Sequence, residues 1–119
     1  MSSRILLVDD DRLLREVIGE YLSSRGYEVD LAEDGEHALA KFSPGRYRLA
    51  ILDLVMPGMN GLELMAKILA QDKEIFCLIM TGYPTIDSAY KSMIEGASDY
   101  IIKPFQLMEL LNIVQKFVP

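Results

Sequence analysis

Four polar sites in the sequence each come directly after a short apolar run. In chain order they are Asp9-Asp10-Asp11, Asp53, Thr81 and Lys103. Carboxylates held close together repel one another, and a hard divalent cation such as Mg²⁺ relieves that repulsion while keeping positions open for water or substrate. A lysine ammonium and a hydroxyl group beside the cation are the groups that neutralise a phosphoryl group during its transfer. These residue types therefore predict magnesium-dependent phosphoryl-transfer chemistry, provided that the fold brings the four sites together.

The apolar runs before these sites predict the strands of a parallel sheet. They are short, often β-branched and apolar on both faces, which is typical of parallel strands covered by helices on two sides. The predicted strands are Ile5–Val8, Glu28–Ala32, Leu49–Leu52, Ile75–Met80 and Tyr100–Ile102. All of them except the second end at one of the four polar sites. Ligands of such sheets bind outside the carboxyl ends of the strands, so we expect the four sites to meet there.

The segments between the runs have the spacing of amphipathic helices, and we expect each apolar stripe to face the core. The first stripe comprises Leu14, Val17, Ile18, Tyr21 and Leu22, and the fourth comprises Ile86, Ala89, Tyr90, Met93 and Ile94. The strict alternation of predicted strands with predicted helices indicates a (βα)5 α/β fold, a doubly wound five-stranded parallel sheet with helices on both faces. A length of 119 residues predicts a single domain over residues 1–119.

Composition excludes several classes of function. The net charge is −6 and the basic residues are scattered, so we expect no direct binding of nucleic acid. The longest apolar run, Ile75–Met80, is too short to cross a membrane. The single cysteine, Cys77, is expected to be a buried core residue without a redox role, and its isolation predicts a reducing, cytoplasmic location. The sequence has no Gly-x-x-x-x-Gly-Lys loop, which argues against nucleotide binding of that kind.

Taken together and in order, four segments resemble the receiver domain of two-component response regulators, in the CheY-like superfamily. They are ILLVDDD at 5–11, DLVMPGMNG at 53–61, MTG at 80–82 and GASDYIIKPF at 96–105. The resemblance covers essentially the whole chain. It implies a flavodoxin-like sheet with strand order 2-1-3-4-5.

The resemblance also implies a role for each residue of the site. Asp53 would be the phosphoacceptor, and Asp9, Asp10 and Asp53 would bind Mg²⁺ or Mn²⁺ together with the backbone carbonyl of Val55. Lys103 and Thr81 would bind the phosphoryl group. Gly58 and Gly61 are expected to be turn residues that allow the backbone path to that carbonyl.

Thr81 and Tyr100 would form the switch. Phosphorylation would draw Thr81 inward, Tyr100 would fill the vacated space, and the face built from the fourth helix, fifth strand and fifth helix would repack. That face would control an output domain or partner, with transcription the expected output, and could form a phosphorylation-dependent homodimer. The phosphoryl donor would be a sensor histidine kinase or a phosphotransfer protein, and a C-terminal output domain is expected to be missing from this sequence. The domain would not be an enzyme that turns over an external substrate.

Two other interpretations stay open from the residues alone. Asp9-Asp10-Asp11 also fits the Asp-x-Asp nucleophile motif of haloacid dehalogenase-type phosphohydrolases, although Leu13 stands where that motif has threonine or valine. The second alternative is a receiver-like domain that only binds partners and is not phosphorylated. Outside the site, Asp11 is expected to cap the helix that follows it, and His37 is expected to be a solvated helix residue.

Overall fold

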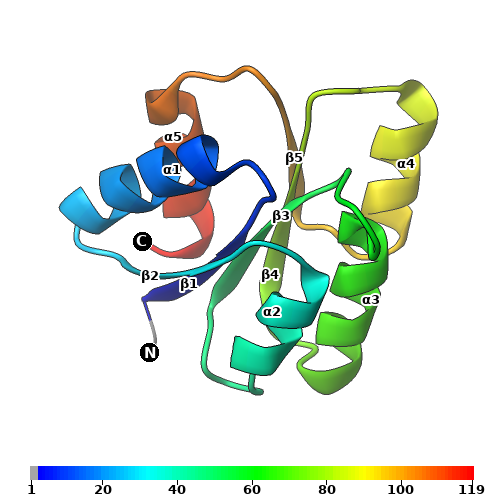
Figure 1. Cartoon of the computed structure of the whole chain (residues 1–119), viewed down its shortest axis with the longest axis horizontal. Coiled ribbons are helices and arrows are strands. Elements are labelled where there is room, and N and C mark those ends of the chain that lie inside the picture. Colours follow the sequence, from blue (N-terminus) through cyan, green and yellow to red (C-terminus); the bar gives the residue numbers. More distant parts are fainter. Residues whose placement is uncertain (1–2) are drawn as a thin grey trace.

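The computed structural model describes residues 3–119, where five strands and five helices alternate along the chain (Figure 1). The strands are β1 (Arg4–Val8), β2 (Glu28–Ala32), β3 (Leu49–Asp53), β4 (Phe76–Thr81) and β5 (Asp99–Ile102). The helices are α1 (Arg12–Ser24), α2 (Gly35–Lys41), α3 (Gly61–Gln71), α4 (Ile86–Ile94) and α5 (Leu107–Phe117). The strands are all parallel, in the order β2-β1-β3-β4-β5. The predicted fold class and strand order are confirmed.

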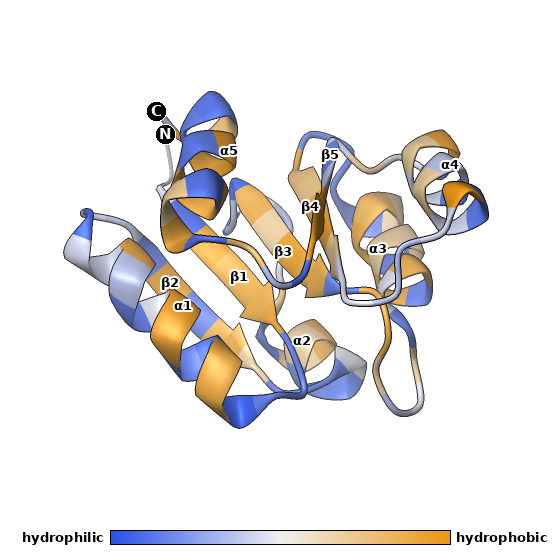
Figure 2. Ribbon diagram, turned by 90° about the horizontal axis from the view of Figure 1, so that it is seen from above, coloured by the Kyte–Doolittle hydropathy of each residue, from blue (hydrophilic) through white to orange (hydrophobic). Residues whose placement is uncertain are grey.

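Alternate residues of the central strands face two separate hydrophobic clusters. On β1, for example, Ile5 and Leu7 face the cluster under α1 and α5, whereas Leu6 and Val8 face the cluster under α2 and α3. Figure 2 shows the apolar strands between these helix layers, with α4 beside α3. Among the described residues, no helix is both long and apolar enough to serve as a membrane span. The central strands β1, β3 and β4 are buried on both faces, and the edge at their carboxyl ends is left for polar groups.

At their carboxyl ends, two strands extend one residue further than the apolar pattern predicts, and β1 and β5 each begin one residue earlier than predicted. Asp53 is the last residue of β3 and Thr81 is the last residue of β4, while β4 begins at Phe76 and not at Ile75. The sheet pairing continues at this edge, because the Leu54 N–H donates to the Met80 carbonyl at 2.8 Å and the Lys103 N–H donates to the Thr81 carbonyl at 2.7 Å. Polar residues at strand ends thus have their backbones held by the sheet.

The prediction that the apolar stripe of α4 faces the core is wrong. The exposed fractions of its large apolar side chains are 90% for Ile86, 68% for Tyr90 and 64% for Ile94. The face of α4 toward the sheet carries small residues instead, with Ser92 buried and Ala89 half-buried. Helical periodicity identifies an apolar stripe but not what covers it, which is why the sequence pattern misled us here.

Gly61, the first residue of α3, fits closely against the backbone of Asp53. A Cβ atom at Gly61 would lie 2.4 Å from the Asp53 carbonyl oxygen and 3.0 Å from the Asp53 carbonyl carbon. The Gly61 N–H also donates to the Leu54 carbonyl at 2.9 Å. The role of Gly61 is therefore to permit this close approach of α3 to the end of β3, and not only to form a turn.

We predict that Gly61→Ala lowers the free energy of unfolding by about 1–3 kcal/mol, because the added methyl group meets backbone atoms that cannot move aside as a flexible side chain could. Urea denaturation measures this change. Gly82→Ala is the matched control, because a Cβ atom at Gly82 finds its nearest neighbour, Lys103 Cβ, at 3.9 Å. Equal stability of the two variants would show that the close approach of α3 to Asp53 has no energetic consequence.

Candidate functional site

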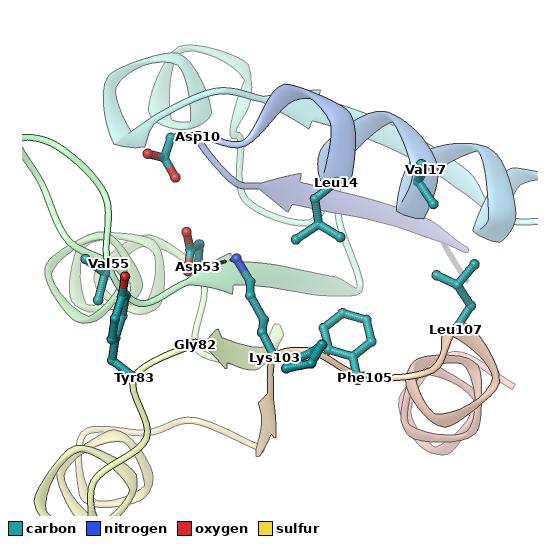
Figure 3. A pocket seen from close by; sticks show the side chains of 11 residues that line it. Asp10, Leu14, Val17, Asp53, Val55, Gly82, Tyr83, Lys103, Phe105 and Leu107 are labelled. Atoms are coloured by element: carbon teal, nitrogen blue, oxygen red, sulfur yellow. Dashed lines mark ion pairs between the residues drawn. The ribbon is translucent and has the colours of Figure 1, made fainter.

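Three carboxylates and one lysine meet at the carboxyl edge of the sheet. Asp9 and Asp10 follow β1, Asp53 ends β3, and Lys103 follows β5. Lys103 Nζ lies 2.8 Å from Asp9 Oδ2 and 3.4 Å from Asp53 Oδ1. Oxygen atoms of the three carboxylates all lie within 4.8 Å of one another. Figure 3 shows Lys103 extended to Asp53, with Asp10 on the other side of that carboxylate.

Burial differs among these charged groups and sets their electrostatics. Asp9 is fully buried and Asp53 is 5% exposed, whereas Asp10 is exposed. The pKa of Asp53 is raised to about 6, chiefly because burial disfavours its charge and secondly because Asp9 repels it, while Lys103 acts in the opposite direction. Burial by itself would lower the pKa of Lys103, but the hydrogen bond and charge of Asp9, together with the charge of Asp53, raise that pKa above its usual value. Lys103 is therefore a permanent cation in the site.

The turn between β1 and α1 holds the first two carboxylates in place. Asp9 Oδ1 accepts a hydrogen bond from the Asp11 N–H at 2.9 Å, and Asp11 in turn caps α1 by accepting from the Leu14 N–H at 3.2 Å. The predicted capping role of Asp11 is confirmed. Arg15 Nη1 donates to the Asp9 carbonyl oxygen at 2.7 Å. Arg15 thus fixes the peptide that joins Asp9 to Asp10, a contact that nothing in the sequence pattern indicated.

Thr81 and Tyr100 lie on the next two strands along the sheet, Thr81 at the end of β4 and Tyr100 on β5. Thr81 is fully buried and is adjacent to Met80, the register partner of Asp53. Its hydroxyl oxygen accepts a hydrogen bond from the Tyr83 N–H at 3.0 Å. Tyr100 is half-buried on β5, and its hydroxyl lies 3.1 Å from Ser88 Oγ on α4. The Lys103–Pro104 peptide bond that follows β5 is cis.

A pocket of about 780 Å³ opens beside the carboxylates and has two kinds of wall. The polar wall is formed by Asp10, Asp53 and Lys103. Apolar residues from α1 and from the segment leading into α5 line the rest, and Val55 and Tyr83 flank Asp53 (Figure 3). The apolar wall includes Leu14, Val17, Phe105 and Leu107. Part of the predicted core stripe of α1 therefore lines this pocket, and Val17 is 40% exposed.

The donor set suits a hard divalent cation. Carboxylate oxygens are the ligands that Mg²⁺ prefers, and Mg²⁺ usually binds through one or two carboxylates while it keeps several waters. A cation beside Asp10 and Asp53 would also offset the burial and the repulsion by Asp9 that together raise the pKa of Asp53. The residues present therefore fit a divalent metal site that is open to the pocket.

Comparison with known proteins agrees with this architecture. A parallel sheet of order 2-1-3-4-5 is the flavodoxin-like fold found in CheY-like domains, and here an acidic cluster lies at its carboxyl edge. The model of the response regulator receiver domain family matches residues 5–115, so the chain belongs to that family, the receiver domains of two-component systems.

Relatives and solved structures support the same assignment. The chain is 37% identical to the response regulator protein FleR of Pseudomonas aeruginosa, covering 98% of the chain and 24% of FleR. It is 40% identical to the response regulator MprA of Mycobacterium tuberculosis, covering 93% of the chain and 48% of MprA. A CheY-like receiver domain from Methanospirillum hungatei superimposes with a TM-score of 0.93 at 31% identity, covering 99% of this chain and 94% of that one. The chain thus spans about a quarter of FleR and about half of MprA.

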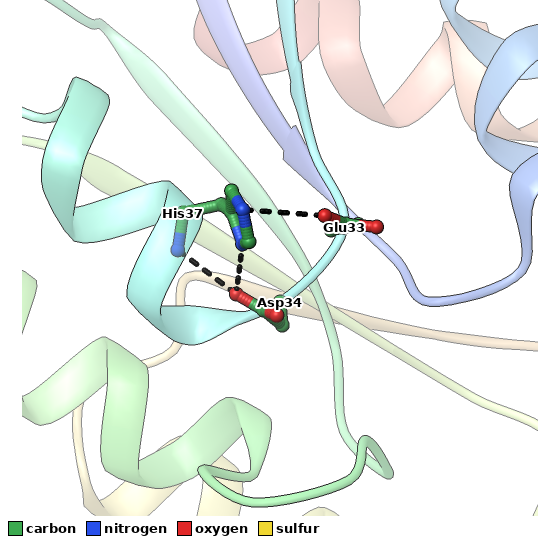
Figure 4. A group of neighbouring side chains, drawn as sticks. All are labelled: Glu33, Asp34 and His37. Carbon is green, nitrogen blue, oxygen red and sulfur yellow. Dashed lines mark hydrogen bonds and ion pairs between the residues drawn. The ribbon is translucent and has the colours of Figure 1, made fainter.

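A second group of ionisable side chains lies at the start of α2, away from these carboxylates (Figure 4). His37 Nδ1 lies 2.8 Å from Asp34 Oδ1, and His37 Nε2 lies 3.2 Å from Glu33 Oε1. Asp34 also caps α2 by accepting from the His37 N–H at 2.8 Å. Both ring nitrogens can donate only when the imidazole is protonated. We therefore interpret this group as an ion-paired helix cap; His37 is exposed, as predicted, but it is not without partners.

We predict that NMR titration finds the pKa of His37 above its usual value of 6.5, because the hydrogen bond that the imidazolium donates to Asp34, and then the charge of Asp34, favour the protonated ring. Since the folded-state pKa is raised, the stabilisation is complete below pH 6.5 and is lost as the pH rises through the folded-state value. Asp34→Asn should return the pKa toward 6.5. Glu36→Gln is the control and should change it much less, and a Glu36→Gln shift as large as that of Asp34→Asn would contradict the assigned geometry.

Proposed function

We propose that this receiver domain is a phosphorylation-activated switch and that Asp53 is its phosphoacceptor. The observation that carries the proposal is the position of Asp53, which is buried beside a permanent cation at 3.4 Å and has two further carboxylates within 4.8 Å. With a pKa of about 6, its carboxyl group is mostly ionised at neutral pH and can act as a nucleophile. A carboxylate oxygen of Asp53 attacks the phosphorus of a phosphohistidine, the phosphorus–nitrogen bond breaks, and an acyl phosphate forms.

The residues that would hold the divalent cation, Mg²⁺ or Mn²⁺, are Asp9, Asp10, Asp53 and the backbone carbonyl of Val55. The cation supplies positive charge where phosphorylation replaces one negative charge by nearly two. The protein's own part is to hold the carboxylates in position. Asp9 is fixed by the Asp11 N–H and by Lys103, so the charge that faces the pocket comes mainly from Asp10 and Asp53.

Lys103 and Thr81 complete the proposed site from the neighbouring strands. The Lys103 ammonium binds the phosphoryl oxygens and keeps the positive charge near Asp53 constant during transfer. The Thr81 hydroxyl donates to the phosphoryl group, and Tyr100 responds to the new position of Thr81. This response repacks the α4-β5-α5 face, so that a local change of charge alters a surface remote from it.

The phosphoryl donor we propose is a sensor histidine kinase or a phosphotransfer protein, and the domain itself turns over no external substrate. Because the chain spans only part of FleR and MprA, we propose that residues 1–119 act as one receiver unit whose output domain, a transcriptional one, lies on a longer chain. We propose the cytoplasm as the location of the receiver domain, and the single cysteine, Cys77, which is free and buried, is consistent with a reducing compartment.

The exposed apolar side chains of α4 support a homodimer through the α4-β5-α5 face. On this face Ile86, Tyr90 and Ile94 are each more than half exposed, and Ile102 of β5 is 50% exposed. Ile86, Tyr90 and Ile94 are spaced four residues apart along one side of α4, and an exposed apolar stripe marks an interaction site more often than scattered single residues do. We propose that phosphorylation brings two copies together here.

Labelling with radioactive acetyl phosphate tests the phosphoacceptor. We expect at most one phosphoryl group per chain in the presence of Mg²⁺, background labelling in excess EDTA, and recovery on addition of Mn²⁺. Asp53→Asn should reduce labelling to background because the nucleophile is gone. Asp11→Asn is the matched control and should label as the wild type does, because asparagine can still cap α1.

Three outcomes would overturn this proposal. They are full labelling in EDTA, labelling of Asp53→Asn, and release of many phosphates per chain from a phosphomonoester. The last would instead indicate a phosphohydrolase.

Light scattering with and without beryllofluoride, an analogue of the phosphoryl group, tests the homodimer. We expect the mass to double from 13.4 kDa when beryllofluoride and Mg²⁺ are added. Ile94→Glu should keep the protein monomeric because it places a charge in the apolar face. Leu13→Glu is the control, because Leu13 is similarly exposed, at 72%, but lies on α1. A dimer that survives Ile94→Glu and is lost with Leu13→Glu would place the interface on the other side of the molecule.

A further inference from the structure

Helix α4 is held to the rest of the domain by small and polar residues. Within Ile86–Ile94 the buried residue is Ser92, and Ser88 and Ala89 are half-buried. By contrast, α3 buries Leu64, Met65 and Ile68. An element with few buried apolar side chains opens more easily than its neighbours. Individual hydrogen bonds therefore contribute a larger part of the free energy that attaches α4 to the domain than they do for α3.

The hydroxyl of Ser88 sits at the centre of these bonds. Ser88 Oγ accepts from the Thr85 N–H at 3.1 Å and donates to the Thr85 carbonyl at 3.0 Å, within the capping box that begins α4. A serine hydroxyl has one proton to donate and two lone pairs. Ser88 Oγ also lies 3.1 Å from the Tyr100 hydroxyl, and either hydroxyl can donate in that bond. This bond links β5 directly to the cap of α4.

Tyr100 lies where it can transmit a change from the candidate site. It pairs in register with Ile79, two residues before Thr81 on β4, and its ring packs against the cluster under α2 and α3. The loop that joins β4 to α4 is held at both of its ends. The Tyr83 N–H donates to Thr81 Oγ1 at one end, and the Thr85–Ser88 capping box closes the other.

We propose that Ser88 is a positioning residue that couples Tyr100 to the first turn of α4. A movement of Tyr100 breaks the hydroxyl bond and weakens the attachment of α4 to β5. The role of Ser88 as a link in the switch rests on the proposed function of Tyr100. The hydrogen bond and its effect on α4 do not.

Hydrogen exchange of the amides in residues 86–94, measured by mass spectrometry with and without beryllofluoride and Mg²⁺, tests the proposal. Tyr100→Phe removes the hydroxyl and keeps both the ring and the capping box, whereas Ser88→Ala removes the bond and part of the cap. We expect each to speed exchange by about 2- to 10-fold, the effect of losing one hydrogen bond. The double variant should exchange no faster than Ser88→Ala alone, because both changes remove the same bond.

Two control variants separate this coupling from a general loosening of α4. Thr85→Ala removes the N-cap side chain of α4 and keeps the hydroxyl of Ser88, so it should speed exchange without changing the response to beryllofluoride. Tyr90→Phe removes the hydroxyl of an exposed tyrosine on the same helix and should change neither quantity. In Ser88→Ala and Tyr100→Phe, the change in the exchange rate of the α4 amides on adding beryllofluoride and Mg²⁺ should be at least about 2-fold smaller than in the wild type.

The outcomes separate this proposal from the proposed function. Wild-type exchange and a wild-type response in Tyr100→Phe would overturn the role of Ser88, even if Asp53 is labelled normally. If the wild type shows neither labelling nor a response to beryllofluoride, the proposed function fails. Faster exchange in both single variants would then still support the Ser88–Tyr100 bond as an attachment of α4, and unchanged exchange would reject it.

Discussion

The ion pair between Lys103 and the carboxylates of Asp9 and Asp53 is the interaction on which this structure depends. A parallel sheet directs the carboxyl ends of its strands to one edge, and here that edge collects like charges. Asp9 is fully buried, and a buried charge is tolerated only when it is paired and hydrogen-bonded. Lys103 supplies the pairing from the far side of the sheet, across β3 and β4. Strand order and charge balance are thus linked, because this order places the loop after β5 where Lys103 reaches Asp9 after β1 and Asp53 at the end of β3.

The rest of the site keeps those charges in fixed positions through the backbone. Gly61 lets α3 approach the carbonyl of Asp53, and Arg15 binds the carbonyl of Asp9 at 2.7 Å. Both contacts act on peptide groups next to the carboxylates and not on the carboxylates themselves. An electrostatic site needs this rigidity, since charges that could relax away from one another would lose the strained arrangement that favours a cation. The pKa of Asp53 is raised first by burial of its carboxylate and then by the charge of Asp9, which the fixed backbone keeps nearby.

Much of the fold could be predicted from the sequence because its central strands are buried on both faces. Runs such as Leu49–Leu52 are apolar without alternation, and a polar site at the end of every run except the second marks the sheet edge. Strand order was carried over from the family resemblance, because apolar periodicity is the same for any order of strands. The contact of Arg15 with the Asp9 carbonyl had no sequence signal, since it joins a side chain to a backbone atom. Gly61 was predicted as a turn residue, because a close approach between segments is visible only in three dimensions.

The exposed face of α4 was predicted wrongly for the same reason, because the sequence does not show which surfaces meet in three dimensions. This face also bears on how the domain can work. A stripe containing Ile86 and Ile94 would ordinarily be buried, and burying it against the sheet would hold α4 through many apolar contacts. Here the stripe faces outward, and the inner face carries Ser88 and Ser92. Moving a helix held in this way costs about the free energy of a few hydrogen bonds. A change of charge at a nearby site can supply a free energy of that size. The exposed apolar stripe moves together with α4. A movement of α4 therefore changes how well a partner binds to this stripe.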